Sequence, residues 1–181
     1  PLMVKPAQGG SGLGAAVVRE ASALPAAMVG CFGYDSTALV ERYVAGMDVA
    51  VSIVDLGDGP RALPAVEIVP RNGVYDYAAR YTAGLTTWHA PARLSAAIAD
   101  QVAQTALAAH SALGLRDLSR VDLIVDDAGQ PHVLEVNVSP GMTETSLLPL
   151  AVQAAGLDFG QLLGTLVTRA AGRLTAGRSS D

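Results

Sequence analysis

The stretch "DLIVDDAGQPHVLEVNVSPGMTETS", residues 122–146, decides the fold because it contains two short apolar runs on either side of a turn. Three side chains that bear oxygen atoms, Asp122, Glu135 and Asn137, interrupt these runs. Asparagine is a poor strand former, so its place in a hairpin that otherwise reads as buried requires a reason. The stretch therefore predicts a β-hairpin that carries a functional site.

The simplest register for this hairpin uses Ala128-Gly129 as a two-residue turn. That register places Asp122 opposite Glu135, and Arg120 opposite Asn137. Because side chains alternate between the two faces of a strand, these four polar residues share one face. The other face takes the apolar residues that we expect in the core: Leu123, Val125, Leu134 and Val136.

Two carboxylates directly opposite each other, here Asp122 and Glu135, repel. A divalent cation bound beside them reverses the sign of that interaction. Ligands that are all oxygen suit Mg²⁺ or Mn²⁺ rather than zinc. Mg²⁺ usually keeps water or phosphate oxygens in its shell, so a site with few protein ligands indicates a phosphate-bearing partner. The alternative is a polar strand that simply faces solvent.

A glycine-rich loop, "KPAQGGSGLG" at residues 5–14, follows the first apolar run and surrounds Ser11 with Gly9, Gly10, Gly12 and Gly14. Its spacing does not match the dinucleotide-binding fingerprint, and Ala15-Ala16 replace the Lys-Ser/Thr of a P-loop. Backbone N–H groups can still bind phosphate oxygens, with Lys5 as the cation. A plain hairpin loop explains the same residues equally well.

Composition narrows the classes of protein. Half of the 181 residues are hydrophobic, which allows a packed core for one domain or somewhat more. The net charge of −5 argues against a nucleic-acid partner. The single cysteine, Cys31, excludes an internal disulfide and suits a reducing compartment such as the cytoplasm. No apolar run approaches the roughly 20 residues of a membrane span.

The order of patterns favours an α+β fold with a mainly antiparallel sheet. Strand patterns occupy residues 1–6, 15–20, 38–44, 48–56 and 61–69, and helix patterns occupy 20–33, 94–114, 147–156 and 158–175. Residues 70–93 match neither period and predict an irregular lid loop. A chain that opens inside a strand without an initiator Met indicates a fragment of a longer protein.

Three segments together resemble the C-terminal, ATP-grasp part of the D-alanine–D-alanine ligase family: "VKPAQGGSGLG", "YDYAARY" and "RVDLIVDDAG…LEVNVSPGMTETSLLP". The resemblance runs in the same order from about residue 1 to 170. It implies an ATP-grasp fold with part of the central subdomain at 1–45. The C-terminal subdomain follows at 46–175, with the lid loop at 70–93, and 176–181 forms a disordered tail. The family's N-terminal domain is absent from the chain.

The resemblance implies an ADP-forming ligase that joins two D-alanines for peptidoglycan synthesis, and so for the cell wall and cell shape. In this family, ATP phosphorylates the carboxylate of the first D-alanine. The amine of the second D-alanine then attacks the acyl phosphate, and phosphate leaves. The implied ligands are ATP, D-alanine and two Mg²⁺ or Mn²⁺ ions. No nucleic acid or membrane partner is implied, and a homodimer of the full-length protein is compatible with the family.

The nucleotide and metal sites come from the resemblance residue by residue. The phosphates are assigned to the glycine loop and its lysine: Lys5, Gly9, Gly10 and Gly12. The adenine slot and the ribose are assigned to the residues that follow the first helix: Glu41, Arg42, Val44 and Asp48. The metal ligands implied by the family are those of the hairpin: Asp122, Glu135 and Asn137.

The resemblance also assigns the residues around the reacting groups. Arg120 and the Gly141 backbone stabilise the oxyanion, and Ser11 and Tyr81 form a hydrogen bond that closes the lid. Arg80, beside Tyr81, belongs to the same catalytic set. The carboxylate of the second D-alanine is assigned to Ser146 and Leu147.

Four positions depart from the family pattern. Arg80 replaces the usual lysine and Gly12 replaces a common second serine, while Asp48 is shorter than the usual glutamate and Val138 replaces a frequent threonine. These departures leave the acceptor open among D-alanine, D-serine, D-lactate and another amino acid. The expected loss of the N-terminal portion leaves open a further alternative, a nucleotide-binding module without catalysis.

Overall fold

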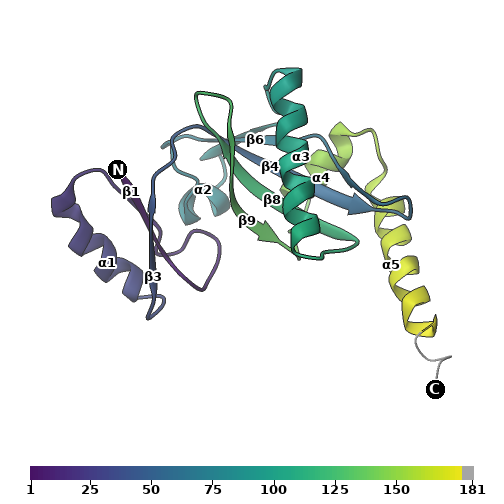
Figure 1. Cartoon of the computed structure of the whole chain (residues 1–181), viewed down its shortest axis with the longest axis horizontal. Coiled ribbons are helices and arrows are strands. Elements are labelled where there is room, and N and C mark those ends of the chain that lie inside the picture. The colour runs from purple at the N-terminus through teal and green to yellow at the C-terminus, as the bar shows by residue number, and fades with distance from the viewer. Residues whose placement is uncertain (177–181) are drawn as a thin grey trace. The chain divides into compact units, whose positions relative to one another are not determined.

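A computed structural model describes residues 1–176 of the chain, and the side chains of residues 1–173 (Figure 1). The chain divides into two compact units. The first unit consists of Pro1–Ala45 and Ile68–Thr87, and the second begins with Gly46–Glu67 and continues from Trp88 toward the C-terminus. Each unit is built around its own packed residues.

The first unit is organised by a three-stranded antiparallel sheet in which β1 (Leu2–Pro6) is central. Its neighbours are β2 (Ala16–Val18) and β3 (Ala38–Arg42), in the order β2-β1-β3. A 3-10 turn, η1 (Ala21–Ala23), leads into α1 (Leu24–Phe32). The strands and the helix expected in this region of the sequence are therefore confirmed.

The helix α1 packs against this sheet through a small apolar core. Val4 of β1, Val18 of β2 and Cys31 of α1 are buried together in that core. Pro25 stands in the first turn of α1, where a missing N–H has no helical partner to lose. Cys31 thus serves as a small apolar core residue, which agrees with the behaviour of most free cysteines.

Residues 70–93 are not the single irregular loop that the sequence predicted. They include a short helix, α2 (Tyr77–Tyr81), and a strand, β7 (Thr86–His89). Asp76 caps the helix by accepting a hydrogen bond from the Ala79 N–H at 2.9 Å. A helix of one turn is too short to show a period in the sequence, so its capping residue is its main signal.

Most of this segment, residues 68–87, groups with the first unit, whereas the sequence analysis placed residues 70–93 within a second subdomain. The reason lies in contacts distant in sequence. The hydroxyls of Ser11 and Tyr81 are 2.7 Å apart. The backbone of Gly12 also lies against the backbone of Asp76. The identity of each unit as an ATP-grasp subdomain stays a prediction.

A six-stranded sheet centres on β4 (Met47–Asp55) and has the order β7-β6-β4-β8-β9, with β5 also paired to β4. The other strands are β5 (Pro60–Ala62), β6 (Val66–Pro70), β8 (Leu118–Val125) and β9 (Pro131–Asn137). Residues 61–69, predicted as one strand, therefore form two. Pro64 lies between them, and because proline has no N–H it cannot continue the hydrogen-bond ladder.

The helix α3 (Ala96–Ala112) covers one face of β4 and β8 (Figure 1). Its Val102 and Ala106 meet the side chains that alternate along those strands: Val49, Val51, Ile53, Val121, Leu123 and Val125. Ser95 caps the start of the helix by accepting from the Ile98 N–H at 3.4 Å. Gly114 ends it with a φ of 60°. This helix confirms the helix pattern predicted at residues 94–114.

Two helices complete the second unit: α4 (Leu147–Ala154) and α5 (Phe159–Ala176). The helix α4 packs against β4, and four of its residues are buried: Leu147, Leu148, Ala151 and Val152. Both helices confirm the sequence pattern. The predicted tail at 176–181 lies outside the described residues, apart from Ala176, which ends α5.

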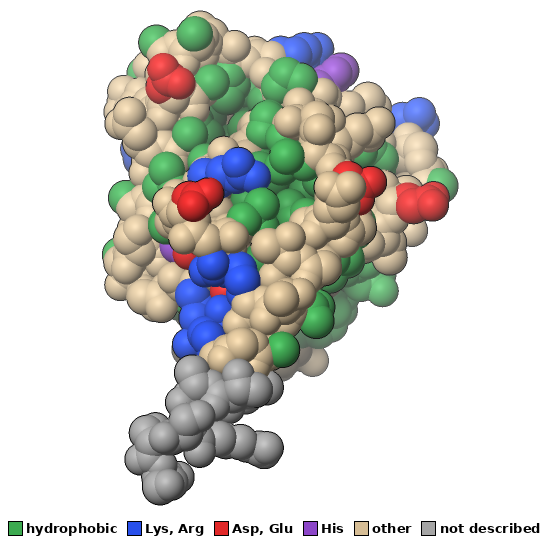
Figure 2. Space-filling model, turned by 90° about the vertical axis from the view of Figure 1, so that its right-hand side faces the viewer, with side chains coloured by type: hydrophobic (Ala, Val, Ile, Leu, Met, Phe, Trp, Pro, Cys, Tyr) green, Lys and Arg blue, Asp and Glu red, His purple; other side chains and the backbone are tan. Residues whose placement is uncertain are grey.

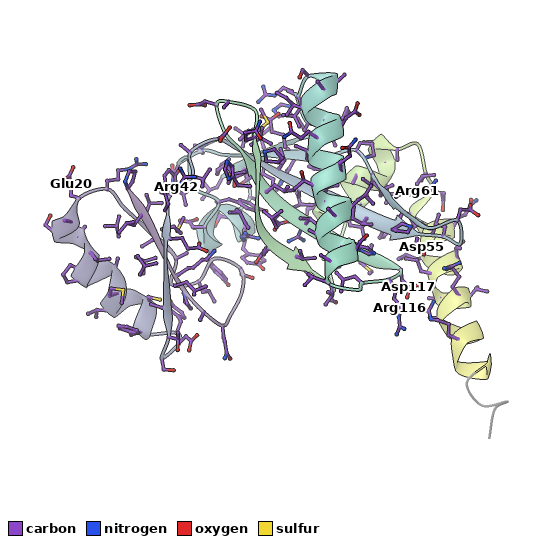
Figure 3. The ribbon with its side chains drawn as sticks, in the orientation of Figure 1. Glu20, Arg42, Asp55, Arg61, Arg116 and Asp117 are labelled. Carbon is purple, nitrogen blue, oxygen red and sulfur yellow. The ribbon has the colours of Figure 1, made fainter. Side chains whose placement is uncertain are left out.

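Ion pairs join α5 to the end of the sheet (Figure 3). Arg173 donates to both carboxylate oxygens of Asp117, at 2.9 and 2.6 Å. Arg169 lies 3.4 Å from Asp55. Figure 2, which faces this end of the molecule, shows basic side chains beside acidic ones. Opposite charges so arranged compensate each other, which indicates a structural role for these arginines.

No single helix among residues 1–176 is long and apolar enough to cross a membrane. Only the pair formed by Leu147–Ala154 and Phe159–Arg173 passes by length and composition, and the two members are bent by 108°.

Glu67 on β6 is a buried carboxylate, with 3% of its surface exposed. It accepts hydrogen bonds from Arg93 Nε at 2.8 Å, from Nη2 at 2.6 Å and from the Arg93 backbone N–H at 3.2 Å. The side-chain hydrogen bonds of Arg93 lower the pKa of Glu67, against the opposing effect of burial. The pair therefore ties β6 to the segment that precedes α3.

We expect Glu67→Gln to lower the free energy of unfolding by about 1–3 kcal/mol, because a neutral amide replaces a carboxylate with charged hydrogen bonds. The folded pKa lies below the ordinary value of 4.5. The stabilisation is thus present above that value and is lost as the pH falls through the folded pKa. Urea unfolding across this pH range should show the difference from wild type shrinking in acid. Asp58→Asn, on an exposed turn, is the control, and an equal effect of both variants would contradict the prediction.

Candidate functional site

The glycine loop is anchored at its start by two backbone hydrogen bonds. The Ala7 N–H donates to the Thr37 carbonyl at 2.9 Å, and the Gln8 N–H donates to Asp35 Oδ2 at 2.7 Å. The bond from Gln8 lowers the pKa of Asp35. Beyond this anchor, Ser11 has a φ of 59°, which is uncommon for a residue with a side chain. The surrounding fold therefore holds Ser11 in a strained conformation, as is frequent at functional sites.

Gly12 has a structural reason to be glycine. Its φ is 72°, and a Cβ atom built on it would lie 3.3 Å from the Asp76 Cα. A serine at this position would press on the backbone that precedes α2. The absence of a side chain thus allows the cap of α2 to approach the loop closely, and the predicted hydrogen bond between Ser11 and Tyr81 is present at 2.7 Å.

Two sets of contacts organise α2 and its flank. The rings of Tyr77 and Tyr81 lie 4.8 Å apart between centroids, with a tilt of 50°. Arg80 places its Cζ 4.2 Å from the ring centroid of Tyr75, and its Nε donates to the Tyr75 carbonyl at 3.4 Å. The sequence analysis assigned no site role to Tyr75. The sequence signal for this contact is a tyrosine five positions before an arginine, with the capping aspartate between them.

The residues assigned to the phosphates and to adenine meet within the first unit. Lys5 Nζ lies 2.6 Å from Glu41 Oε2, in an ion pair between β1 and β3. Arg42 is exposed at the end of β3 (Figure 3), and Val44 follows it and is half-buried. Asp48, assigned to the ribose, lies in the second unit on β4 and is half-buried. The roles of these residues stay predictions.

The hairpin of β8 and β9 has the expected pairs at the end that carries the proposed ligands. Asp122 pairs with Glu135, and Arg120 pairs with Asn137. The turn is longer than predicted, because the Asp126 N–H donates to the Gln130 carbonyl at 3.0 Å and leaves three residues between them. A register shift between Asp122 and its neighbour absorbs the extra residue.

This shift corrects the predicted core face. Leu123 pairs with Val133, and Leu134 is 45% exposed rather than packed in the core. Leu123 and Val125 are buried as predicted, and Val136 packs against the same core. A bulge adds one residue to β9. Beyond the bulge the side chains of β9 alternate between the two faces again, but each residue is displaced by one position relative to β8.

Arg120 and Asp122 form a bidentate ion pair, with distances of 2.6 and 2.9 Å, and each is only 7% exposed. Arg120 Nη2 also lies 4.0 Å from Glu135 Oε1. The repulsion expected between the two opposed carboxylates is thus already offset by a side-chain cation. Asn137 Oδ1 accepts a hydrogen bond from the Ser139 N–H at 2.9 Å.

No group of three or more His, Cys, Asp or Glu side chains within the described part of the chain is arranged to hold a metal ion. The proposed ligand set is different in composition, because it combines the carboxylates of Asp122 and Glu135 with the amide of Asn137. Its donors are all oxygens on one face of a hairpin, which is the chemistry that hard divalent cations require.

Gly141 and Ser146 lie side by side where α4 begins. A Cβ on Gly141 would be 2.7 Å from Ser146 Oγ, so a side chain at this position would displace the Ser146 hydroxyl. The Ser146 hydroxyl accepts from the Thr143 N–H at 3.2 Å and lies 2.8 Å from Thr143 Oγ1. Leu147, the first residue of α4, is buried. The second unit therefore brings together two residues that the resemblance assigned to different steps.

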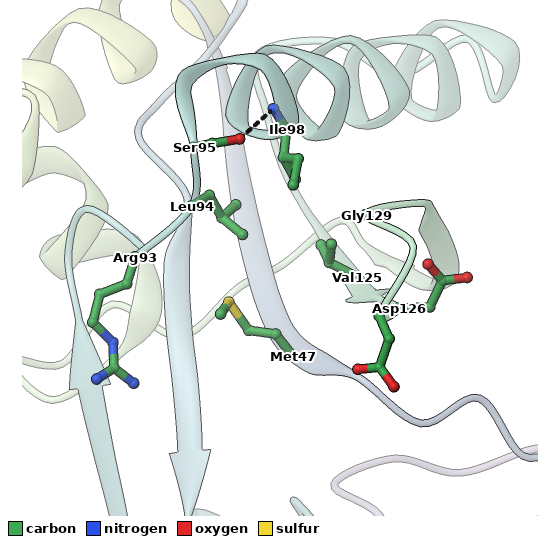
Figure 4. A pocket seen from close by; sticks show the side chains of 9 residues that line it. Met47, Arg93, Leu94, Ser95, Ile98, Val125, Asp126 and Gly129 are labelled. Atoms are coloured by element: carbon green, nitrogen blue, oxygen red, sulfur yellow. Dashed lines mark hydrogen bonds between the residues drawn. The ribbon is translucent and has the colours of Figure 1, made fainter.

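A hollow of about 250 Å³ lies between the start of α3 and the tip of the hairpin (Figure 4). The polar groups around it serve the fold. Arg93 pairs with Glu67, and Asp126 accepts from His132 Nε2 at 2.8 Å as well as from the turn. The hydrogen bond from His132 lowers the pKa of Asp126. None of the predicted site residues lines this hollow.

The hydrogen bond between Ser11 and Tyr81 predicts a measurable coupling. Ser11→Ala and Tyr81→Phe should each lower the local opening free energy around α2 by about 0.5–1.5 kcal/mol, and the double variant should lose no more than either single one. Amide hydrogen exchange of residues 76–82 measures this energy. Tyr34→Phe removes an exposed hydroxyl elsewhere in the unit and serves as the control. Additive losses would show that the two hydroxyls act independently.

Comparison with known proteins extends over nearly the whole chain. Residues 1–168 match the family model described as D-ala D-ala ligase C-terminus. A D-alanine--D-alanine ligase of Pelobacter propionicus is 45% identical over 171 residues, which cover 94% of this chain and 54% of that protein. The chain thus spans about half the length of the curated relatives that it matches.

Solved structures show the same similarity. A D-alanine--D-alanine ligase from Bacillus anthracis complexed with ATP has a TM-score of 0.75 and 32% identity, over 93% of this chain and 51% of that one. The VanG D-Ala:D-Ser ligase from Enterococcus faecalis has a TM-score of 0.82 and 32% identity, over 93% of this chain and 49% of that one.

Proposed function

Because the chain belongs to the D-alanine–D-alanine ligase family, whose C-terminal part it matches over residues 1–168, we propose that the full-length protein is an ADP-forming ligase that joins two D-alanines through a D-alanyl phosphate. The predicted family and its α+β ATP-grasp fold are confirmed. The observation that carries the proposal is the hairpin face on which Asp122 pairs with Glu135 and Arg120 pairs with Asn137.

ATP is the proposed phosphoryl donor, and the neighbour solved with ATP supports this choice. The glycine loop would bind the phosphates through backbone N–H groups, with Lys5 as the cation. Lys5 now pairs with Glu41, so this lysine would exchange one anionic partner for another or serve both. The adenine slot is proposed for Glu41, Arg42 and Val44, and the ribose contact for Asp48.

The hairpin residues fit the metal that the family implies. Both oxygens of Asp122 accept from Arg120, but a carboxylate oxygen has a second lone pair for a cation. The Glu135 side chain is 53% exposed and therefore accessible. With Asn137 these residues would hold Mg²⁺ or Mn²⁺, in a site for two ions. A bound divalent cation supplies charge neutralisation at phosphoryl oxygens.

The acceptor side of the reaction is proposed for residues of the second unit. Arg120 and the Gly141 N–H would stabilise negative charge on the tetrahedral intermediate. The start of α4, with Ser146 and Leu147, would bind the carboxylate of the second D-alanine, because helix N-termini attract anions. The proximity of Gly141 to Ser146 supports this arrangement, because it places the proposed oxyanion donor near the proposed carboxylate-binding residue.

The same proposal gives roles to the first unit. Ser11 and Tyr81 would keep the α2 segment closed over the reactants and exclude water, to which an acyl phosphate is sensitive. The dipeptide would serve peptidoglycan synthesis in the cytoplasm, and hence cell-wall formation and cell shape. The test is direct: full-length protein with ATP, Mg²⁺ and D-alanine should release ADP and phosphate. Absence of turnover with D-alanine would refute the assignment.

We expect Glu135→Gln to lower metal-dependent turnover by at least about 100-fold, because it removes an anionic ligand with little change of volume. Asp127→Asn, at the tip of the same hairpin, removes a charge far from the proposed ligands and should leave turnover within about twofold. Thermal unfolding of both variants controls for the fold. Turnover of Glu135→Gln equal to that of Asp127→Asn would exclude a metal role for Glu135.

D-serine is a second candidate acceptor. The similarity to a D-Ala:D-Ser ligase supports it, as do the departures at Arg80 and Gly12. A panel of D-alanine, D-serine, D-lactate and other amino acids as acceptors distinguishes the candidates. A strict preference for D-alanine would eliminate the alternatives, and ATP binding without turnover on any acceptor would identify a nucleotide-binding module without catalysis.

A further inference from the structure

Arg80 is held by two contacts with one residue, Tyr75. The Arg80 Cζ lies 4.2 Å from the centroid of the Tyr75 ring, and Arg80 Nε donates to the Tyr75 carbonyl at 3.4 Å. Both residues are half-buried, so water competes less with the attraction between the guanidinium and the ring face. The guanidinium is thus restrained in position by the ring and in rotation by the hydrogen bond.

The helix α2 explains why these two residues meet. Its backbone is set by the Asp76 cap and by the Arg80 N–H, which donates to the Asp76 carbonyl at 3.0 Å. Long side chains on a helix lean back toward its N-terminus. Tyr75 lies immediately before the capping residue, so the side chain of Arg80 runs back onto it.

The contact depends on the arginine that departs from the family pattern. A guanidinium is planar, stacks on an aromatic ring and has an N–H at Nε, whereas a lysine ammonium is a compact point charge without a planar face. The hydrogen bond to the Tyr75 carbonyl uses Nε, so it leaves the N–H groups of the two terminal nitrogens of Arg80 out of that bond. They form the fork that binds phosphate oxygens in bidentate fashion.

We propose that Tyr75 is a positioning residue that orients Arg80 so that its terminal nitrogens meet an anionic phosphoryl group. This inference rests on the proposed function, in which α2 acts on a phosphate-bearing substrate. Tyr77 and Tyr81 belong to the separate set of contacts that ends at Ser11. The contact of Tyr75 with Arg80 is therefore distinct from the Ser11–Tyr81 bond.

A double-mutant cycle on the full-length protein tests this role. Tyr75→Leu should lower kcat about tenfold in the wild-type background, and less than about twofold once Arg80→Lys is present, because the positioned group is then gone. Tyr75→Phe keeps the ring and the carbonyl and should retain kcat within about twofold. Equal losses in both backgrounds, or no loss with Tyr75→Leu, would overturn the proposal.

A spectroscopic measurement on this chain is independent of turnover. The Nε proton of Arg80 should be shifted upfield by the ring current in the wild type and in Tyr75→Phe, and should return to its ordinary position in Tyr75→Leu. An unshifted proton in the wild type would overturn the proposal.

If the full-length protein shows no turnover with any acceptor, the proposed function fails and the same cycle is measured as the Kd for ATP with Mg²⁺. If Tyr75→Leu weakens ATP binding roughly tenfold when residue 80 is arginine, and not when Arg80→Lys is present, the result supports the role of Tyr75. Equal loss in both backgrounds overturns it.

Discussion

The buried ion pair between Arg120 and Asp122 is the interaction on which the second unit and its proposed site depend. Both side chains lie within the sheet, where Asp122 stands between Ala50 and Glu135 in the cross-strand register. A buried charge is tolerated only when it is paired, and removing one partner leaves the other uncompensated. A slip of one residue would turn this pair toward α3 and expose Val121 and its alternating neighbours. The pair therefore specifies which face of β8 is polar.

That constraint also explains why one error in the predicted hairpin did not displace the proposed metal ligands. The turn holds one residue more than expected, and the bulge beside Asp122 absorbs it. The polar face imposes this outcome, since Arg120 must remain opposite Asn137 while Leu123 and Val125 remain in the core. The pairs between Leu123 and the turn shift by one residue, and Leu134 is exposed as a result. The site is preserved because the energy of the core and of the ion pair favours the same register.

Two of the residues that depart from the family pattern, Gly12 and Arg80, have neighbours in the structure that account for them. Gly12 allows the backbone of Asp76 to approach the glycine loop, and Arg80 has its guanidinium on the ring of Tyr75. Both partners lie in the α2 segment, so the loop and that segment differ from the family pattern together. Nothing in the described part of the chain explains the valine at position 138. The first unit thus retains the hydrogen bond from Ser11 to Tyr81 with altered neighbours around it.

The sequence alone determined the fold class, the long helix α3 with its caps, the polar face of the hairpin and the family. The family follows from the three motifs that carry the resemblance. The other features follow from the alternation of side chains along a strand, from the helical period and from capping residues, all of which act between near neighbours in the chain. Only the tertiary structure decided that Gly12 lies against the backbone of Asp76, that Arg120 neutralises Asp122, and that Tyr75 holds Arg80. These contacts depend on the relative placement of backbones and on side-chain directions, which residue periodicity does not specify.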